Sequence, residues 1–332
     1  MAVIADDPVL VDDWHPVAAS SAIVCNSLVG TQLLGRELAL WRDATGVLHA
    51  WEDRCPHRGT RFSIGTVEEG QVVCRYHGWR FAAEGPCVRV PALPKDTPAP
   101  RAMARAYAVR ERYGLAWVCV GDPRGEVPPY EETADPALRQ VVCGPYDVAS
   151  SGPRIVENFL DMAHFGYVHE GILGDRTQSE VADYEVAPLP QGEGIIATRC
   201  FAWQPQTNSL SHGGSQVEYT YRVVRPLTAI LTKVPQAQAG FREAISLHVQ
   251  PLGEEMSRVW IVLAMTNFKQ SEAELRAFQD RIFLQDQPIL ENQVPRRLPL
   301  DPAAEIPVRC DRMSVAYRRY LAQRGQIGRA HV

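Results

Sequence analysis

The sequence predicts an α+β fold in two domains, and three features of the chain lead to that prediction. The first third reads as short strands and turns, the segment 121–136 is acidic and rich in proline, and the later apolar runs alternate with polar residues before a well-capped helix. We therefore place a β domain at residues 1–135 and an α+β domain at residues 136–332.

The composition indicates a folded protein without a membrane span. The chain has 332 residues, of which 45% are hydrophobic and 22% charged, enough for a sizeable core. Its net charge of −5 does not favour nucleic acid or an anionic membrane surface as a partner. No apolar run approaches the roughly 18 residues of a membrane span, and the N-terminus carries acids where a signal peptide is positively charged. We expect a soluble, cytoplasmic protein.

Strand pairs are expected in the first domain. Thr31–Trp41 is rich in leucine, turn residues follow at 43–46, and Val47–Trp51 resumes as a strand, so the three predict a hairpin. Ala108–Val120 is a second strand pair or one long strand. The segment Gly121–Pro136 then has the composition of an exposed connector.

Helices and an antiparallel sheet are expected in the second domain. The segment Arg154–Gly166 reads as a helix, and a later helix begins after Ser271, which forms a capping box with Glu274. Between the helices, four runs alternate apolar and polar residues and predict the strands of the sheet, at 218–224, 227–234, 242–252 and 258–268.

Two short loops each combine a cysteine with a histidine, as Cys55-Pro-His57-Arg-Gly and Cys74-Arg-Tyr-His77-Gly-Trp. A structural zinc ion would use these ligand types, and so would a Rieske [2Fe–2S] cluster, which takes two cysteines on one iron and two histidines on the other. Zinc sites usually segregate the two types by loop, whereas a two-iron cluster needs both types in each loop. The mixed loops therefore favour the cluster.

Six further cysteines have no such partner pattern. Disulfides are disfavoured in a reducing cytoplasm, and free cysteines then behave as small hydrophobic residues. We expect all six in the core: Cys25, Cys87, Cys119, Cys143, Cys200 and Cys310.

A second candidate metal site lies between Asn158 and His169. On a regular helix Asn158, Asp161 and His164 share one face, whereas His169 is rotated from His164 by roughly 140°. Both imidazoles reach one metal only if the helix is distorted or ends near Gly166. Two histidines and one carboxylate, with coordination positions left open, form the ligand set of non-haem Fe(II) oxygenases. A third ligand is therefore expected elsewhere.

The helix after Ser271 offers two candidates for the third ligand, Asp280 and Asp286. The predicted buried stripe of this helix consists of Leu275, Phe278, Ile282 and Ile289. Asp286 falls on that stripe, and Asp280 falls between its steps. A carboxylate on an apolar face is costly unless it is paired or bound to metal, so we choose Asp286. The alternative is that the stripe has already reached solvent at this end of the helix.

These motifs resemble those of the Rieske non-haem iron oxygenases. The two loops match the cluster-binding boxes of that family, which also has Asn or Asp before His-x₄-His and a ligand Asp in a late helix. The resemblance covers essentially the whole chain and implies a Rieske β-sandwich domain followed by a helix-grip catalytic domain. It implies a [2Fe–2S] cluster on Cys55, His57, Cys74 and His77, and a mononuclear Fe(II) on His164, His169 and Asp286.

The resemblance also implies a reaction. The short length and the segment Phe283–Asp286 with Gln293 are similar to the single-subunit monooxygenases and demethylases, and the segments 168–175 and 314–320 to saxitoxin-type tailoring hydroxylases. One oxygen atom of O₂ would enter a C–H bond of a small aromatic or alkaloid-like substrate. Electrons would come from NAD(P)H through a separate ferredoxin or flavin reductase, because this chain has no Gly-rich dinucleotide motif.

Beyond the metal ligands, Asp161 and Asn158 are our candidate catalytic residues. The resemblance implies that Asp161 links His164 to His77 of a neighbouring subunit in a head-to-tail homotrimer. Positive charge near the cluster would attract an acidic electron donor. The arginines in question are Arg54, Arg58, Arg61, Arg75 and Arg80.

Two other functions remain open at this point. Arene cis-dihydroxylation would use the same iron, and product analysis separates it from monooxygenation. A Rieske electron carrier or a zinc-stabilised binding module would need only the first site. The segment Asn158–His169 and Asp286 argue against a protein of that kind.

Overall fold

The computed structural model describes residues 7–190, 193–211 and 213–324. It forms two compact units, one ending at Val127 and the other beginning at Pro128. This division falls within the acidic, proline-rich segment, and the domain limits 1–135 and 136–332 stay a prediction. Within the described ranges, no helix combines the length and the apolar composition that a membrane crossing requires.

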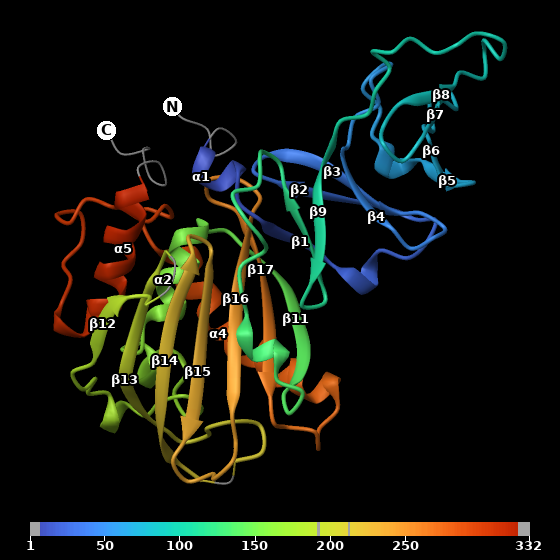
Figure 1. Cartoon of the computed structure of the whole chain (residues 1–332). Helices are drawn as coiled ribbons and strands as arrows, with labels where there is room; N and C mark the ends of the chain where they lie inside the picture. The colour runs from blue at the N-terminus through green and yellow to red at the C-terminus, as the bar shows by residue number, and fades with distance from the viewer. Residues whose placement is uncertain (1–6, 191–192, 212, 325–332) are drawn as a thin grey trace. The chain divides into compact units, whose positions relative to one another are not determined.

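The first unit consists of a short helix and two antiparallel sheets (Figure 1). The six-stranded sheet has the order β1-β10-β9-β4-β3-β2, and the four-stranded sheet the order β5-β6-β7-β8. The elements are α1 (Pro8–Val11), β1 (His15–Ala19), β2 (Leu28–Leu33), β3 (Arg36–Arg42), β4 (Leu48–Glu52), β5 (Thr66–Glu68), β6 (Gln71–Val73), β7 (Arg80–Phe81), β8 (Cys87–Arg89), β9 (Ala106–Arg112) and β10 (Leu115–Cys119).

The expected hairpin is present as β3 and β4, and the pair at 108–120 as β9 and β10. The prediction that Thr31–Trp41 is a single strand is wrong, because this segment contains the turn between β2 and β3. Leu34 and Gly35 form that turn with left-handed φ values of 52° and 75°. Leu34 is an apolar residue that is fully buried although it lies in a turn. Its hydrophobic side chain therefore made the segment resemble a continuous strand.

An aromatic core supports the two cysteine–histidine loops. Trp51, Phe62 and Phe81 are fully buried and meet edge to face, with ring centroids 5.5 and 5.1 Å apart. Burying each such ring contributes about 1.5–3 kcal/mol. Cys55 and Cys74 belong to the same buried cluster, so the core fixes the base of both loops.

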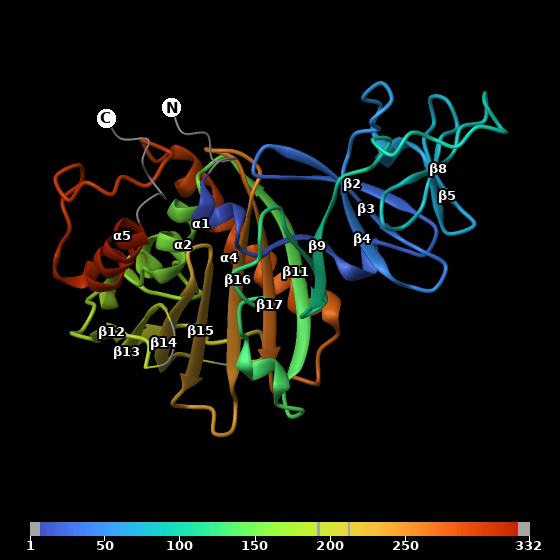
Figure 2. The ribbon, with the colours of Figure 1, turned by 45° about the horizontal axis from the view of Figure 1, so that its top comes forward.

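The second unit is built on a seven-stranded antiparallel sheet with the order β11-β17-β16-β15-β14-β13-β12 (Figures 1 and 2). The four predicted runs correspond to its last four strands along the chain. The other three strands were not predicted: β11 forms one edge of the sheet, and β13 and β12 are the last two strands on the opposite side. The strands are β11 (Arg139–Val148), β12 (Glu185–Pro188), β13 (Ile195–Gln204), β14 (Ser215–Arg225), β15 (Thr228–Pro235), β16 (Glu243–Pro251) and β17 (Ser257–Met265).

The α-helices of the described part of this unit are α2 (Gly152–Leu160), α3 (Phe165–Val168), α4 (Glu272–Asn292) and α5 (Arg312–Arg324). In the view of Figure 1, α2 and α4 lie behind the strands. Helix α2 contacts β15, β16 and α4, and α4 contacts β11, so both helices pack against the sheet. The predicted capping box of Ser271 and Glu274 is present at the start of α4.

Four of the six remaining cysteines lie in the core as expected. Cys25 is exposed and Cys310 is half-buried, so the expectation is wrong for these two. Cys25 lies outside the described helices and strands, and Cys310 lies in a three-residue 3-10 helix, so no strand alternation sets either side chain inward.

Candidate metal centres

The two cysteine–histidine loops share one backbone turn. Cys55–Gly59 follows β4, and Cys74–Gly78 connects β6 to β7. In each loop the glycine N–H donates to the cysteine carbonyl oxygen at 2.9 Å. The glycines have left-handed φ values of 75° and 67°, a conformation that would strain a residue with a Cβ. The two glycines of the motifs are therefore structural requirements of the turns.

The cysteines lie inside and the histidines near the surface. Cys55 and Cys74 are each 2% exposed, whereas His57 is half-buried and His77 is exposed. The two histidine rings have centroids 4.6 Å apart, and His57 stacks on Trp79 at 4.3 Å. A hydrogen bond between the two thiols lowers the pKa of Cys74 and raises the pKa of Cys55, so the two sulfur atoms lie within hydrogen-bond reach of each other.

These four side chains fit a two-iron cluster better than one zinc ion. His57 Nδ1 is buried and has no hydrogen-bond partner among the described residues, as expected of an atom that binds metal. One zinc ion would draw all four ligand atoms to within about 4 Å of one another. Among the residues that the structure describes, the single group that converges on one point is a different one, His164, His169 and Asp286.

The arginines near the loops divide into two groups. Arg61 is paired with Glu37, and Arg80 with Glu68 at 2.8 Å, so their charges are neutralised. The exposed arginines that pair with no described acid are Arg54, Arg58 and Arg75. The positive charge around the cluster loops is therefore carried by this second group.

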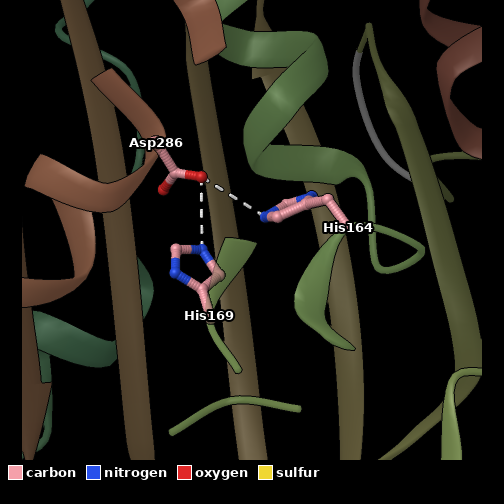
Figure 3. Close-up of side chains that lie close together, drawn as sticks. All are labelled: His164, His169 and Asp286. Carbon is pink, nitrogen blue, oxygen red and sulfur yellow. Dashed lines mark ion pairs between the residues drawn. The ribbon is translucent and has the colours of Figure 1, made fainter. Parts of the chain in front are cut away.

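His164, His169 and Asp286 point toward one another (Figure 3). Asp286 Oδ1 lies 3.4 Å from His164 Nε2 and 3.2 Å from His169 Nε2. Although burial lowers it, the pKa of His169 is raised overall by its hydrogen bond to Asp286 and the charge of that carboxylate. Two imidazoles and one carboxylate at these distances can bind one iron and leave the remaining coordination positions open.

A break in the helix brings the two histidines together. The helix expected over Arg154–Gly166 is confirmed at its start and wrong at its end, because α2 ends at Leu160 and Asp161 has an extended backbone. Asp161 Oδ1 accepts a hydrogen bond from the N–H of Ala163 at 2.7 Å, and this bond closes the turn. The short helix α3 follows, with His164 and His169 as its two caps. The distortion thus precedes His164 and does not occur at Gly166.

Both imidazoles are held through Nδ1. His164 Nδ1 lies 3.2 Å from Asp161 Oδ2, and His169 Nδ1 lies 3.0 Å from Gln285 Oε1. Because a carboxylate or amide oxygen accepts the Nδ1 proton, Nε2 of each ring is free to bind metal. Asp161 was chosen from the sequence, whereas Gln285 was missed, although it directly precedes Asp286.

Helix α4 places Asp286 on its buried side. The buried residues of this helix are Leu275, Gln279, Phe283, Asp286 and Leu290. Ile289, which was expected in the stripe, is 45% exposed because the stripe ends on Leu290 instead. Asn158 Nδ2 lies 3.4 Å from Asp286 Oδ1. Asp280 accepts a hydrogen bond from the Tyr146 hydroxyl at 2.6 Å and is turned away from the histidines.

A mainly apolar cavity opens beside the three ligands. Its empty volume of about 670 Å³ includes the open solvent at its mouth. Its walls include Phe159, Leu231, Ile245 and Phe283. Tyr221, Lys233 and Gln279 add polar groups, and none of these was identified from the sequence, because periodicity shows burial and not what a side chain faces.

Two family models match the chain. Residues 13–109 match the Rieske [2Fe–2S] domain, and residues 148–326 match the vanillate O-demethylase oxygenase C-terminal domain. The first match contains both cysteine–histidine loops, and the second contains His164, His169 and Asp286.

Individual proteins agree with these models. A probable methylxanthine N7-demethylase, NdmC of Pseudomonas sp. (strain TJI-51), is 34% identical over 320 residues, 96% of each chain. The structure of NdmA of Pseudomonas putida CBB5 with caffeine has a TM-score of 0.82 and 25% identity, covering 96% of this chain and 92% of that one. Oxidoreductase NdmD of P. putida is 40% identical over 118 residues, 35% of this chain and 20% of that protein.

Proposed function

Because this chain belongs to the Rieske non-haem iron oxygenases, we propose that it is a monooxygenase that removes a methyl group from a small nitrogen heteroaromatic ring. The observation that carries this proposal is the pair of histidines and Asp286 converging at the wall of an apolar cavity. The likeness to a methylxanthine demethylase along almost the whole chain supports the choice of substrate.

The reaction balances with one O₂ and one NADH. An N-methyl C–H bond gains one oxygen atom, the other oxygen atom leaves as water, and two electrons and two protons are consumed. The N-hydroxymethyl product then releases formaldehyde and leaves N–H on the ring. When bound, the cluster and the mononuclear iron supply electron storage and O₂ activation.

The residues of this chain would hold and orient the reacting groups. We assign the cluster to Cys55, His57, Cys74 and His77, and the iron to His164, His169 and Asp286. Asp161 and Gln285 fix the two imidazole rings, and Asn158 donates toward Asp286. The apolar walls would exclude water and keep the methyl group of the substrate beside the metal.

We further propose that the chain acts as a head-to-tail homotrimer, in which His77 of one copy faces Asp161 of the next. Asp161 and His164 line a surface groove together with Ile306, which is 92% exposed. Tyr76, next to His77, is 59% exposed. Exposed apolar side chains near Asp161 and next to His77 suit a buried contact between two copies of the chain.

The electron donor is proposed to be a separate reductase. The match to part of NdmD shows that a stretch of this chain resembles a segment of an oxidoreductase. The exposed Arg58 and Arg75 would attract an acidic carrier. A cytoplasmic location, where NADH is available, fits this supply.

Product analysis tests the proposed reaction. Purified protein, a reductase and NADH are supplied with caffeine, theobromine, vanillate or a saxitoxin-type precursor, the last because of the segments 168–175 and 314–320. We expect a demethylated xanthine and equimolar formaldehyde. A cis-diol would indicate the dihydroxylation alternative, and hydroxylation of the precursor alone would favour the saxitoxin-type resemblance.

The metal content provides a first check. The purified protein should be red-brown and contain about three irons per chain, two in the cluster and one at the second site. Metal analysis and the visible spectrum measure this directly. A colourless protein with stoichiometric zinc would contradict the assignment of the first site.

Charge reversal near the cluster should slow electron delivery. In Arg58→Glu or Arg75→Glu, reduction of the cluster should slow by about tenfold at low salt, because steering between opposite charges is lost, while the product stays the same. Stopped-flow reduction at increasing ionic strength measures the effect. The matched control is Arg61→Gln with Glu37→Gln, which removes an existing ion pair and leaves the local net charge unchanged, so reduction should slow less. Rates independent of salt would leave these arginines as ordinary surface charge.

A further inference from the structure

A buried ion pair lies in the wall of the cavity. Lys233 on β15 and Glu243 on β16 face each other across the sheet, with Nζ and Oε2 2.8 Å apart. Their side chains are only 4% and 8% exposed. Apolar residues of similar volume are often at least as stabilising as a buried ion pair, so stability alone does not account for its presence.

The ion pair connects two cavities. Lys233 lines the cavity beside His164, His169 and Asp286, and it also lines a smaller cavity that Glu243 shares. The ammonium of Lys233 has three N–H donors, and Glu243 is its one ionic partner among the described residues. Donors remain available to a molecule in the cavity.

Gln279 of α4 lines the same two cavities. It is 7% exposed, and its amide makes no hydrogen bond to any described residue. The other amides at the smaller cavity are satisfied: Asn208 donates to Gln238 at 2.6 Å, and Asn267 donates to Gln270 at 2.7 Å. Buried amides are almost always hydrogen-bonded, so Gln279 is a group that a ligand can satisfy.

Tyr221 adds a second unsatisfied group. It lines the cavity beside the metal ligands, it is 1% exposed, and its hydroxyl has no hydrogen-bond partner within the described ranges. Burial raises the pKa of Tyr221 well above its usual range, so the hydroxyl stays neutral and can donate.

We propose that Lys233, Gln279 and Tyr221 form a subsite that recognises the lactam edge of a neutral heteroaromatic substrate, a ring carbonyl next to a ring N–H. This inference rests on the proposed function and specifies which part of the substrate the side chains of the cavity recognise. The carbonyl accepts from the ammonium or the hydroxyl, and Gln279 can donate and accept at once, as a C=O and N–H pair requires. Glu243 already balances Lys233, so a carboxylate substrate would find no net opposite charge.

Three probes distinguish these features in calorimetric titrations of the iron-loaded protein without O₂. Theobromine has ring carbonyls and a ring N–H between them, caffeine has the carbonyls only, and vanillate is a carboxylate. Theobromine should bind about tenfold more tightly than caffeine, and vanillate more weakly than both. Gln279→Leu should weaken theobromine more than caffeine, because only theobromine has a ring N–H that donates to the Gln279 oxygen.

The ion pair is tested by removing both charges together. Lys233→Met with Glu243→Gln leaves no unpaired charge, and it should weaken both xanthines about tenfold to a hundredfold. The matched control is Arg222→Met with Glu132→Gln, another largely buried pair in the same unit that does not line either cavity. This control should bind theobromine within about twofold of the wild type.

The inference is contradicted if wild-type protein binds neither xanthine, if vanillate binds most tightly, or if Gln279→Leu and the Lys233/Glu243 double variant bind theobromine as the wild type does. Because binding is measured without turnover, its outcome is separate from that of the proposed reaction. Theobromine that binds as expected but is recovered unchanged under O₂ and NADH would overturn the demethylation and leave the subsite in place.

Discussion

Replacing His164 or Asp286 by alanine is expected to abolish turnover and leave the visible spectrum of the cluster intact. The two candidate sites share no ligand, and the second group consists of three side chains among the described residues, so the loss of one should release the iron. Iron content should fall from about three per chain to about two. Product formation, metal analysis and the spectrum are measured on the same preparation.

Asp280→Ala is the matched control on the same helix. Asp280 contacts Tyr146 and not the histidines, so this variant should retain its iron and most of its activity. It should lose about 1–3 kcal/mol of unfolding free energy, because the hydroxyl of the buried Tyr146 is left without its acceptor. An inactive Asp280→Ala beside an active Asp286→Ala would show that the assignment of the third ligand is wrong.

Two differently inactivated chains are expected to restore each other's activity. One chain carries His77→Ala and lacks a working cluster, and the other carries His164→Ala and lacks the iron site. In a head-to-tail trimer every junction runs from the cluster of one copy to the iron of the next, so each mixed trimer has one working junction. Random equal mixing makes roughly three-quarters of the trimers mixed, and activity should recover to roughly a quarter of wild type. Electron transfer within one chain predicts no recovery.

Two controls make this experiment decisive. Each variant alone must be inactive, and differently tagged copies must be shown to co-purify as mixed trimers. Asp161→Asn then tests the route, because the cluster and the iron should stay bound while transfer between them slows. Mixed trimers that form but show no activity would rule out transfer between copies.

The candidate metal ligands could be chosen from the sequence because metal binding restricts the residue types. Cys55, His57, Cys74 and His77 stand in short mixed loops that few other functions require, and the local turns depend only on residues within each loop. Asp286 could be preferred over Asp280 because helical periodicity places only one of them on the buried side. Strands β14 to β17 also followed from local alternation of apolar and polar residues.

Apolar patterns failed where a side-chain hydrogen bond to the backbone, or packing from elsewhere in the chain, decides the structure. The break after Leu160 follows from a side chain closing a turn onto the backbone, and apolar spacing does not record such a bond. Leu34 is buried at a turn because the surrounding sheet covers it, so its hydrophobicity was misread as continuation of a strand.

The sequence by itself therefore identified the family, and it predicted the two sets of candidate metal ligands and a β domain followed by an α+β domain. Only the tertiary structure showed that Gln285 holds His169, and that Lys233, Gln279 and Tyr221 face the same cavity as the iron ligands. The physical reason is that these side chains come from β14, β15 and α4, and only the packing of that helix against the sheet brings them together.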